Sequence, residues 1–123
     1  MDWKLELVQV PVSDVDRAIA FFKDQAGFNL DHDHQPSADL RFVQLTPPGS
    51  GCSIAMGPPS EMAPGSLQGL QLVVPDIEAA HAELSGRGVE VGEIQDLPWG
   101  SFVFCKDPDG NGWAVQQVTP RNA

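Results

Sequence analysis

One short segment of this sequence concentrates residue types that bind metal ions. Residues 31–34 read Asp-His-Asp-His, and on a strand His32 and His34 would point to the same side because side chains alternate between faces. Two imidazoles can begin a zinc or iron site. No third ligand is evident nearby in the sequence. A polar edge strand or loop is therefore the favoured interpretation, and the role of the segment stays open.

The remaining histidine and the two cysteines are expected to be packed structural residues and not catalytic ones. His81 falls on the apolar stripe of an expected helix, which predicts a partly buried structural residue. Cys52 and Cys105 are the only cysteines and lack metal-type spacing, so reduced, packed thiols are expected. Apart from Lys106 beside Cys105, neither cysteine has a basic neighbour, and no Ser-His-Asp or Cys-His arrangement is evident. The sequence predicts no catalytic residue and leaves open whether the protein is an enzyme.

The elements that must position any site occur twice along the chain. Asp14 and Asp76 can each cap a helix by accepting the free N–H groups of its first turn. Pro-Gly turns that contain Gly49 and Gly110 follow at the same offset, to within one residue. This register indicates an ancestral duplication of one supersecondary module. A central site should therefore be built from both halves.

Each half reads as a strand, a helix and three further strands, which predicts an α+β fold. A helix on one face of a mixed sheet leaves the other face uncovered, so two tandem βαβββ modules are expected to form a cupped mixed sheet with the helices on its outer face. The expected strands span 4–11, 28–33, 40–45 and 52–57 in the first half, and 89–94, 101–106 and 112–118 after the second helix. A single domain of 1–123 is predicted, with a first module at 1–57, a connector at 58–67, a second module at 68–118 and a tail at 119–123.

Composition and charge narrow the classes of partner. The chain has 123 residues, of which 41% are hydrophobic, enough to bury one core but not two independent ones. Its formal net charge of −10 argues against nucleic acid, because phosphate binding needs Lys/Arg patches, and favours attraction of a cationic ligand. No apolar stretch approaches the length of a membrane span. A cytoplasmic protein that binds neither nucleic acid nor membrane is expected, and the uncovered sheet face predicts a homodimer with a mainly apolar interface.

Two motifs carry a family resemblance. Val12-Ser13-Asp14 precedes the run Ala18-Ile19-Ala20-Phe21-Phe22 and Gly27-Phe28, and the second half contains the turn Asp107-Pro108-Asp109-Gly110-Asn111. In these segments the chain resembles the vicinal oxygen chelate superfamily, which includes glyoxalases, extradiol dioxygenases, fosfomycin-modifying enzymes and bleomycin-binding resistance proteins. The resemblance covers nearly the whole chain and implies the paired βαβββ fold.

The resemblance also implies where a divalent ion would sit. In the metal-dependent members, His, Glu or Gln side chains from the first and last strand of each module hold the ion in the cup. The matching positions here are Leu7, Leu70, Ala114 and either Ser53 or Ala55. Only Ser53 among them carries a ligand atom, and a lone hydroxyl is a poor ligand. A metal-independent member without a metal or other cofactor is therefore expected.

The cup that remains would be apolar with a few amide groups. If Leu7 faces it, strand alternation adds Gln9, and the same count turns Gln71 toward the helix unless that strand is reversed. Trp99 could stack a planar ligand from a loop, while Trp113 should pack under a helix. Such a pocket would bind a mostly apolar molecule and orient it by hydrogen bonds. The predicted ligand-binding residues are Leu7, Gln9, Ser53, Ala55, Leu70, Leu72, Trp99, Phe102, Phe104, Ala114 and Gln116.

These observations favour a metal-free small-molecule binding protein of the glyoxalase and bleomycin-resistance type, which sequesters an apolar or cationic metabolite or antibiotic. The main alternative is a metal-independent enzyme, an isomerase, epimerase or cyclase acting on a small natural product. A scaffold whose cup is filled by its own side chains is a third reading, and a metal-dependent glyoxalase or dioxygenase is disfavoured. A buried carboxylate with a raised pKa in the cup would favour the enzyme, whereas a dry cup lined by leucines and amides would favour binding.

Overall fold

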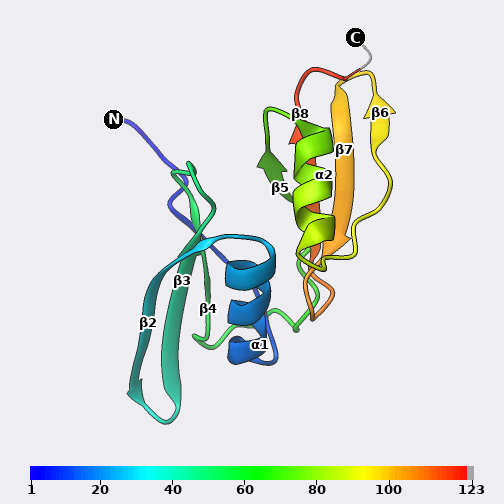
Figure 1. The fold of residues 1–123 in the computed structure, drawn as a ribbon. Coiled ribbons are helices and arrows are strands. Elements are labelled where there is room, and N and C mark those ends of the chain that lie inside the picture. The colour runs from blue at the N-terminus through cyan, green and yellow to red at the C-terminus, as the bar shows by residue number, and fades with distance from the viewer. Residues whose placement is uncertain (122–123) are drawn as a thin grey trace.

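The computed structural model describes residues 1–121, which form two α+β modules of the same type (Figure 1). The first module contains β1 (Leu7–Gln9), α1 (Val15–Ile19), a π-helical continuation η1 (Ala20–Gln25), β2 (Asn29–Ser37), β3 (Leu40–Thr46) and β4 (Ser53–Met56). The second contains β5 (Leu70–Val73), α2 (Ile77–Gly86), β6 (Gln95–Leu97), β7 (Gly100–Lys106) and β8 (Gly112–Gln117). The predicted α+β class with two βαβββ modules is confirmed. Residues 122 and 123 of the predicted tail lie outside the described residues.

Both helices begin where the sequence predicts. The carboxylates of Asp14 and Asp76 accept the backbone N–H groups of Arg17 and Ala79, each at 3.1 Å. Each bond satisfies one of the N–H groups that the first turn of a helix leaves free. The first helix ends before Gly27, whose φ of 81° is a left-handed conformation that glycine adopts without strain.

The first helix changes its winding part-way along, which the sequence did not predict. Residues Ala20–Gln25 are π-helical, and the Ala26 N–H bonds the Phe21 carbonyl five residues back at 2.8 Å. Phe21 and Phe22 are consecutive residues of this segment, and both are buried in the core.

The strands form two separate four-stranded sheets of matching topology. Their orders are β1-β4-β3-β2 and β5-β8-β7-β6. In each sheet the first and last strands of the module pair in parallel, and the remaining pairs are antiparallel. No ladder joins β1 to β5 within the described residues. The expected single cupped sheet is therefore not continuous within one chain.

One predicted strand is misplaced. The sequence placed a strand at 89–94, but the ladder forms later, at β6, and Val91 makes only an isolated bridge with Cys105. A tight turn of Pro98 and Trp99 pairs Leu97 with Gly100, and this register carries the strand pairing no further back than Gln95. The turn, and not the apolar pattern of 89–94, decides which residues pair.

The helix-facing sides of the two sheets share one apolar core. Phe22 and Phe28 of the first module contact Trp113 of the second, with ring centroids 5.4 Å and 5.8 Å apart. Val43 and Leu45 of the first sheet belong to the same buried cluster. In Figure 1, α1 accordingly lies between the first sheet and the second module. The two helix-free sides, here called the first and second open faces, therefore point away from this shared core.

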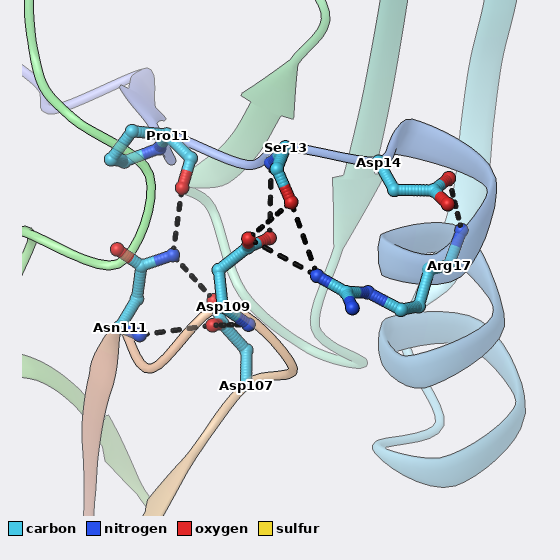
Figure 2. A network of polar contacts seen from close by, with 7 residues as sticks. All are labelled: Pro11, Ser13, Asp14, Arg17, Asp107, Asp109 and Asn111. Carbon is cyan, nitrogen blue, oxygen red and sulfur yellow. Dashed lines mark hydrogen bonds and ion pairs between the residues drawn. The ribbon is translucent and has the colours of Figure 1, made fainter.

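A polar network fastens the second module to the start of α1 (Figure 2). Asn111 is fully buried, and its amide donates to the Pro11 carbonyl at 2.9 Å and to the Asp107 carboxylate at 2.8 Å. Its side-chain oxygen accepts the Leu67 N–H at 3.1 Å. Asp107 also accepts the backbone N–H of Asn111 at 2.9 Å, which closes the turn between β7 and β8. The turn that carries the family resemblance thus has a structural task here.

Asp109 completes this network from the same turn. Its carboxylate accepts the Ser13 N–H at 3.1 Å and the Ser13 hydroxyl, and it pairs with Arg17 at 3.1 Å. Burial by itself would raise the pKa of Asp109, but the hydrogen bonds from Ser13 and the Arg17 charge outweigh it and hold the pKa below its usual value. The ionised carboxylate therefore stabilises the junction of the modules.

Among the described residues, no helix has the length and apolar character needed to cross a membrane.

Candidate ligand-binding site

The first open face is built from alternating residues of β1, β4 and β3. Ile54 and Met56 pack in the core, so Ser53 and Ala55 point to the other side of the sheet. In the register of the ladder, Leu7 lies beside Ser53 and Gln9 beside Ala55. These four residues were predicted to face one cup, and the structure places them on one side of one sheet.

A chain of hydrogen bonds crosses this face. The Thr46 hydroxyl donates to the Asp31 carboxylate, and the hydroxyl oxygens of Thr46 and Ser53 are 2.7 Å apart. Because Thr46 gives its only proton to Asp31, Ser53 donates to Thr46. The Gln44 amide donates to the Ser53 oxygen at 3.4 Å. Gln44 and Thr46 were not among the predicted site residues, although the register of the β3–β4 hairpin would have identified them.

The Asp-His-Asp-His segment lies on β2, at the edge of the first sheet. His32 is in register with Gln44 and His34 with Phe42, which puts both imidazoles on the first open face. The rings stack with centroids 5.6 Å apart and an interplanar angle of 23°. The segment is exposed throughout. The interpretation as a polar edge strand agrees with this placement.

The second open face is aromatic where the first is polar. Phe102 and Phe104 of β7 lie parallel, with ring centroids 6.0 Å apart and an interplanar angle of 5°. Phe102 is buried, whereas Phe104 is 44% exposed. Ala114 of β8 is in register with Phe104, and Gln116 with Phe102. All four residues were predicted for the cup, and they share one side of the second sheet.

Two amide groups and a backbone carbonyl cross this face as well. The Gln71 amide donates to the Gln116 side-chain oxygen at 2.5 Å, and the Gln116 amide donates to the Trp99 carbonyl at 3.0 Å. Trp99 lies in the turn before β7 with its side chain 63% exposed. The turn thus adjoins the second open face through its backbone, and the predicted stacking of a ligand on Trp99 stays a prediction.

The facing predicted for β5 is wrong. Leu70 and Leu72 are in register with Trp113 and Val115, and both leucines pack against the core on the helix side. Gln71 therefore points to the second open face. The error came from counting back from Asp76 without a ladder to fix the register, and a slip of one residue turns every side chain of a strand to the other side.

Cavities adjoin the open-face residues at the edges of the sheets. Gln9 borders a cavity of about 330 Å³ between the end of β1 and the proline-rich connector. Phe104 and Ala114 border one of about 280 Å³ that also touches Lys106. Each is open to solvent.

The shifted carboxyl groups of the described residues serve structure. Hydrogen bonds from Arg41 hold the pKa of Asp33 below its usual value, and those from Ser101 and Arg121 do the same for Asp96. Asp109, described above, is shifted in the same direction. A general base poised near neutral pH needs the opposite shift. These carboxylates therefore act as ionised partners in salt bridges.

The cysteine beside the second open face is not activated. Burial raises the pKa of the Cys105 thiol, and the charge of Asp107 raises it further. A nucleophilic cysteine needs a lowered pKa, because the thiolate is the reactive form. Cys105 therefore acts as a packed residue, as the sequence predicts.

Comparison with known proteins decides the family. A model of the Glyoxalase/Bleomycin resistance protein/Dioxygenase superfamily matches residues 4–115. The chain belongs to this superfamily. The resemblance drawn from the helix-start and turn motifs is thereby confirmed.

Two solved structures and one sequence relative match this chain over most of its length. TnmS3, described as an antibiotic-binding protein from Streptomyces sp. CB03234, is 37% identical and covers 96% of this chain and 98% of its own, with a TM-score of 0.87. A glyoxalase/bleomycin resistance protein from the same organism is 38% identical over 93% of this chain and 100% of its own, with a TM-score of 0.81. The uncharacterized protein YetH of Bacillus subtilis (strain 168) is 30% identical over 89% of this chain and 94% of its own.

The residues at the superfamily's metal positions do not fit a divalent ion. Leu7 and Ala114 carry no donor atom, and the register of β5 puts Gln71 beside Ala114 where Leu70 was expected. The Ser53 oxygen and the Gln71 amide are each engaged in hydrogen bonds within their own sheets. No group of three or more His, Cys, Asp or Glu side chains within residues 1–121 could hold a metal ion. The donor set is that of a member which lacks the metal ligands.

Proposed function

We propose that this protein binds and sequesters a small, mostly apolar molecule, with the two open faces as the walls of the binding site. The observation that carries the proposal is the contrast between those faces. The exposed Phe104 ring, which lies parallel to the buried Phe102 ring, offers a surface for a planar group, and the Gln44, Thr46 and Ser53 chain offers hydrogen-bonding groups. The antibiotic binding of the relative TnmS3 supports a natural product as the ligand class.

We further propose that the complete site forms between two copies of the chain. Within one chain the helix-facing sides share a core, so the open faces cannot face each other across one ligand. The edge strands β1 and β5 each have a free side, and exposed apolar residues lie near them, with Leu5 72% and Val73 66% exposed. A twofold dimer would set the first open face of one copy beside the second open face of its partner.

A metal-independent enzyme is the second candidate function, and one observation favours it. The Asp31 carboxylate accepts a hydrogen bond from Thr46, which accepts one from Ser53, so a proton has a path from the face to a carboxylate. An isomerase, epimerase or cyclase could use such a path. In both functions the protein acts in the cytoplasm on a small molecule and not on nucleic acid or membrane.

The test is a native mass spectrometry and thermal-shift screen against a library of metabolites and antibiotics, with each hit recovered and analysed. Sequestration predicts a stabilising hit that leaves the protein chemically unchanged. Conversion of a hit to an isomer or a cyclised product would establish the enzyme instead. Elemental analysis after dialysis should find no stoichiometric Zn, Ni, Mn or Fe.

A matched pair of variants connects the hit to the site. Phe104→Ala should weaken binding about tenfold, which corresponds to about 1.4 kcal/mol. Leu40→Ala is the control for the second open face, because Leu40 and Phe104 are both 44% exposed but Leu40 lies in the first sheet, at the tip of the β2–β3 hairpin. Equal affinities of the two variants would remove the second open face from the site.

Light scattering or sedimentation tests the dimer. A mass near twice the chain mass is expected at micromolar concentration. A mass near 13.2 kDa would contradict the proposed assembly.

A further inference from the structure

We infer that His32 and His34 recognise a carboxylate on the ligand, with the protonated imidazole as the stronger partner. The inference rests on the proposed small-molecule site and adds a chemical class to its ligand. Both residues belong to the Asp-His-Asp-His segment at residues 31–34, and no structural role accounts for the two imidazoles.

The placement of the two rings is the first argument. Both imidazoles project from β2 to the first open face, in register with Gln44 and Phe42 of β3. Their centroids are 5.6 Å apart, so the ring nitrogens of both can reach the oxygens of one carboxylate. The Gln44 amide beside them belongs to the hydrogen-bond chain that crosses the face. A ligand held by that chain would therefore bring its polar end close to the histidines.

The engagement of the neighbouring carboxylates is the second argument. Asp33 points to the helix side, where Arg41 donates two hydrogen bonds to it, each at 2.9 Å. Asp31 accepts the Thr46 hydroxyl. No hydrogen bond joins either imidazole to another described side chain. The two acidic residues of the segment thus have partners, while the two histidines keep their ring nitrogens for a ligand.

The charges around the pair are the third argument. The β3 residues in register with it, Phe42 and Gln44, are uncharged, and the charged groups close by are Asp31 and Asp33 on β2 itself and Arg41 behind the sheet. Arg41 is occupied by Asp33 and Asp16. A ligand anion on this face would therefore depend on protonated imidazole for a positive partner. Protonated histidine donates from both nitrogens, and such charge-assisted bonds are stronger than neutral ones.

The direction of the pH effect follows from the preference of an anion for protonated imidazole. An anion binds the protonated pair better than the neutral pair, so its affinity increases as the pH falls from 8 to 5.5. A carboxylic acid ligand stays ionised over this range, because carboxyl groups release their proton near pH 4. An uncharged ligand of the same shape should show no such change.

The experiment uses 2-naphthoate and its neutral amide, 2-naphthamide, titrated into the full-length protein at pH 5.5 and pH 8 in the presence of EDTA. We expect naphthoate to bind about tenfold more tightly at pH 5.5 than at pH 8, and naphthamide to bind equally at both. His32→Gln/His34→Gln should lose the pH dependence for naphthoate and keep the affinity for naphthamide. His81→Gln is the control, since His81 lies on α2 and not on an open face.

Three outcomes would overturn the inference. These are an equal pH dependence for both probes, a pH dependence that survives in the double variant, and the absence of naphthoate binding at pH 5.5. Binding that appears only when EDTA is replaced by Zn²⁺ or Cu²⁺ would make the pair a metal site and would also overturn it. None of these results decides the proposed function, because the library screen detects binding at the open faces whether or not the ligand is an acid.

Discussion

The two modules of this chain repeat one scaffold but differ at corresponding positions of their turns and open faces. Gly49 and Gly110 mark the same turn in each module, and both adopt positive φ angles. The residue that follows is Ser50 in the first module and Asn111 in the second. The exposed Ser50 hydroxyl bonds only to Cys52 among the described residues, whereas the Asn111 side chain is buried and joins three segments. Only one copy of the turn therefore carries the junction between the modules.

The open faces diverge in the same way. Ser53 in β4 and Ala114 in β8 stand four residues after their turn glycines, and each starts the open side of its strand. Ser53 links Thr46 to Gln44, while Ala114 lies beside the Phe104 ring. The backbone pattern is the same in both modules, because strand pairing and helix caps depend on it. The open-face side chains carry no such constraint and are polar in one module and aromatic in the other.

The difference between the two turns predicts that Asn111→Ala destabilises the protein much more than Ser50→Ala does. The first change removes the bonds to the Pro11 carbonyl and the Asp107 carboxylate, leaves the Leu67 N–H without its partner and should lower the free energy of unfolding by about 3 kcal/mol. The second removes two exposed local hydrogen bonds with Cys52 and should change it by less than about 0.5 kcal/mol. Denaturant unfolding measures both. Similar losses would mean that the junction does not depend on the second turn.

Asp109→Asn should have a smaller effect that depends on pH. Because the pKa of Asp109 lies below its unfolded value of 3.8, its ionised form stabilises the fold above that pH, and the contribution disappears as the pH falls through the folded pKa. At pH 7 the variant should be about 1 kcal/mol less stable. The difference from the unsubstituted protein should shrink as the pH is lowered toward 3. A difference that is constant over this range would show that packing and not charge is responsible.

The smallest effect is expected from exchanging the residues at two corresponding positions, with Ser53→Ala and Ala114→Ser. The exchange tests whether the polar and aromatic faces contribute differently to ligand affinity. Ser53→Ala interrupts the hydrogen-bond chain and should weaken a library hit about threefold, since a neutral hydrogen bond contributes little net free energy. Ala114→Ser adds a hydroxyl beside Phe104 and should not restore that loss in the double variant. Affinities from calorimetry, compared among the three variants, test this. Full restoration would mean that the polar and aromatic faces are interchangeable.

The helix caps and the turn at Gly110 could be predicted from the sequence, because they depend on contacts between near neighbours. Asp14 and Asp76 cap their helices within three residues, and the turn at Gly110 closes within four, so short motifs carry enough information to locate them. The module order and the family follow from these motifs. The residue limits set for the two modules and the connector stay predictions.

Other features depended on contacts that are distant in sequence. The facing of Leu70 and Leu72 is set by the ladder with β8, and counting from a helix start missed it by one residue. Gln44 and Thr46 join the predicted Ser53 on the first open face only through the pairing of β3 with β4. Likewise, the sequence could not tell whether the modules pair within a chain or between chains.

The helix caps, the turns and the lack of metal-binding side chains at Leu7 and Ala114 could be derived from the sequence, because they are properties of residue type and local spacing. Which side of each strand is open depends on tertiary packing. The packing of Phe22 and Phe28 on Trp113 turns the helix sides of both sheets inward and leaves the polar and aromatic faces outside. Burial of the largest apolar side chains sets that orientation, and it involves residues far apart along the chain.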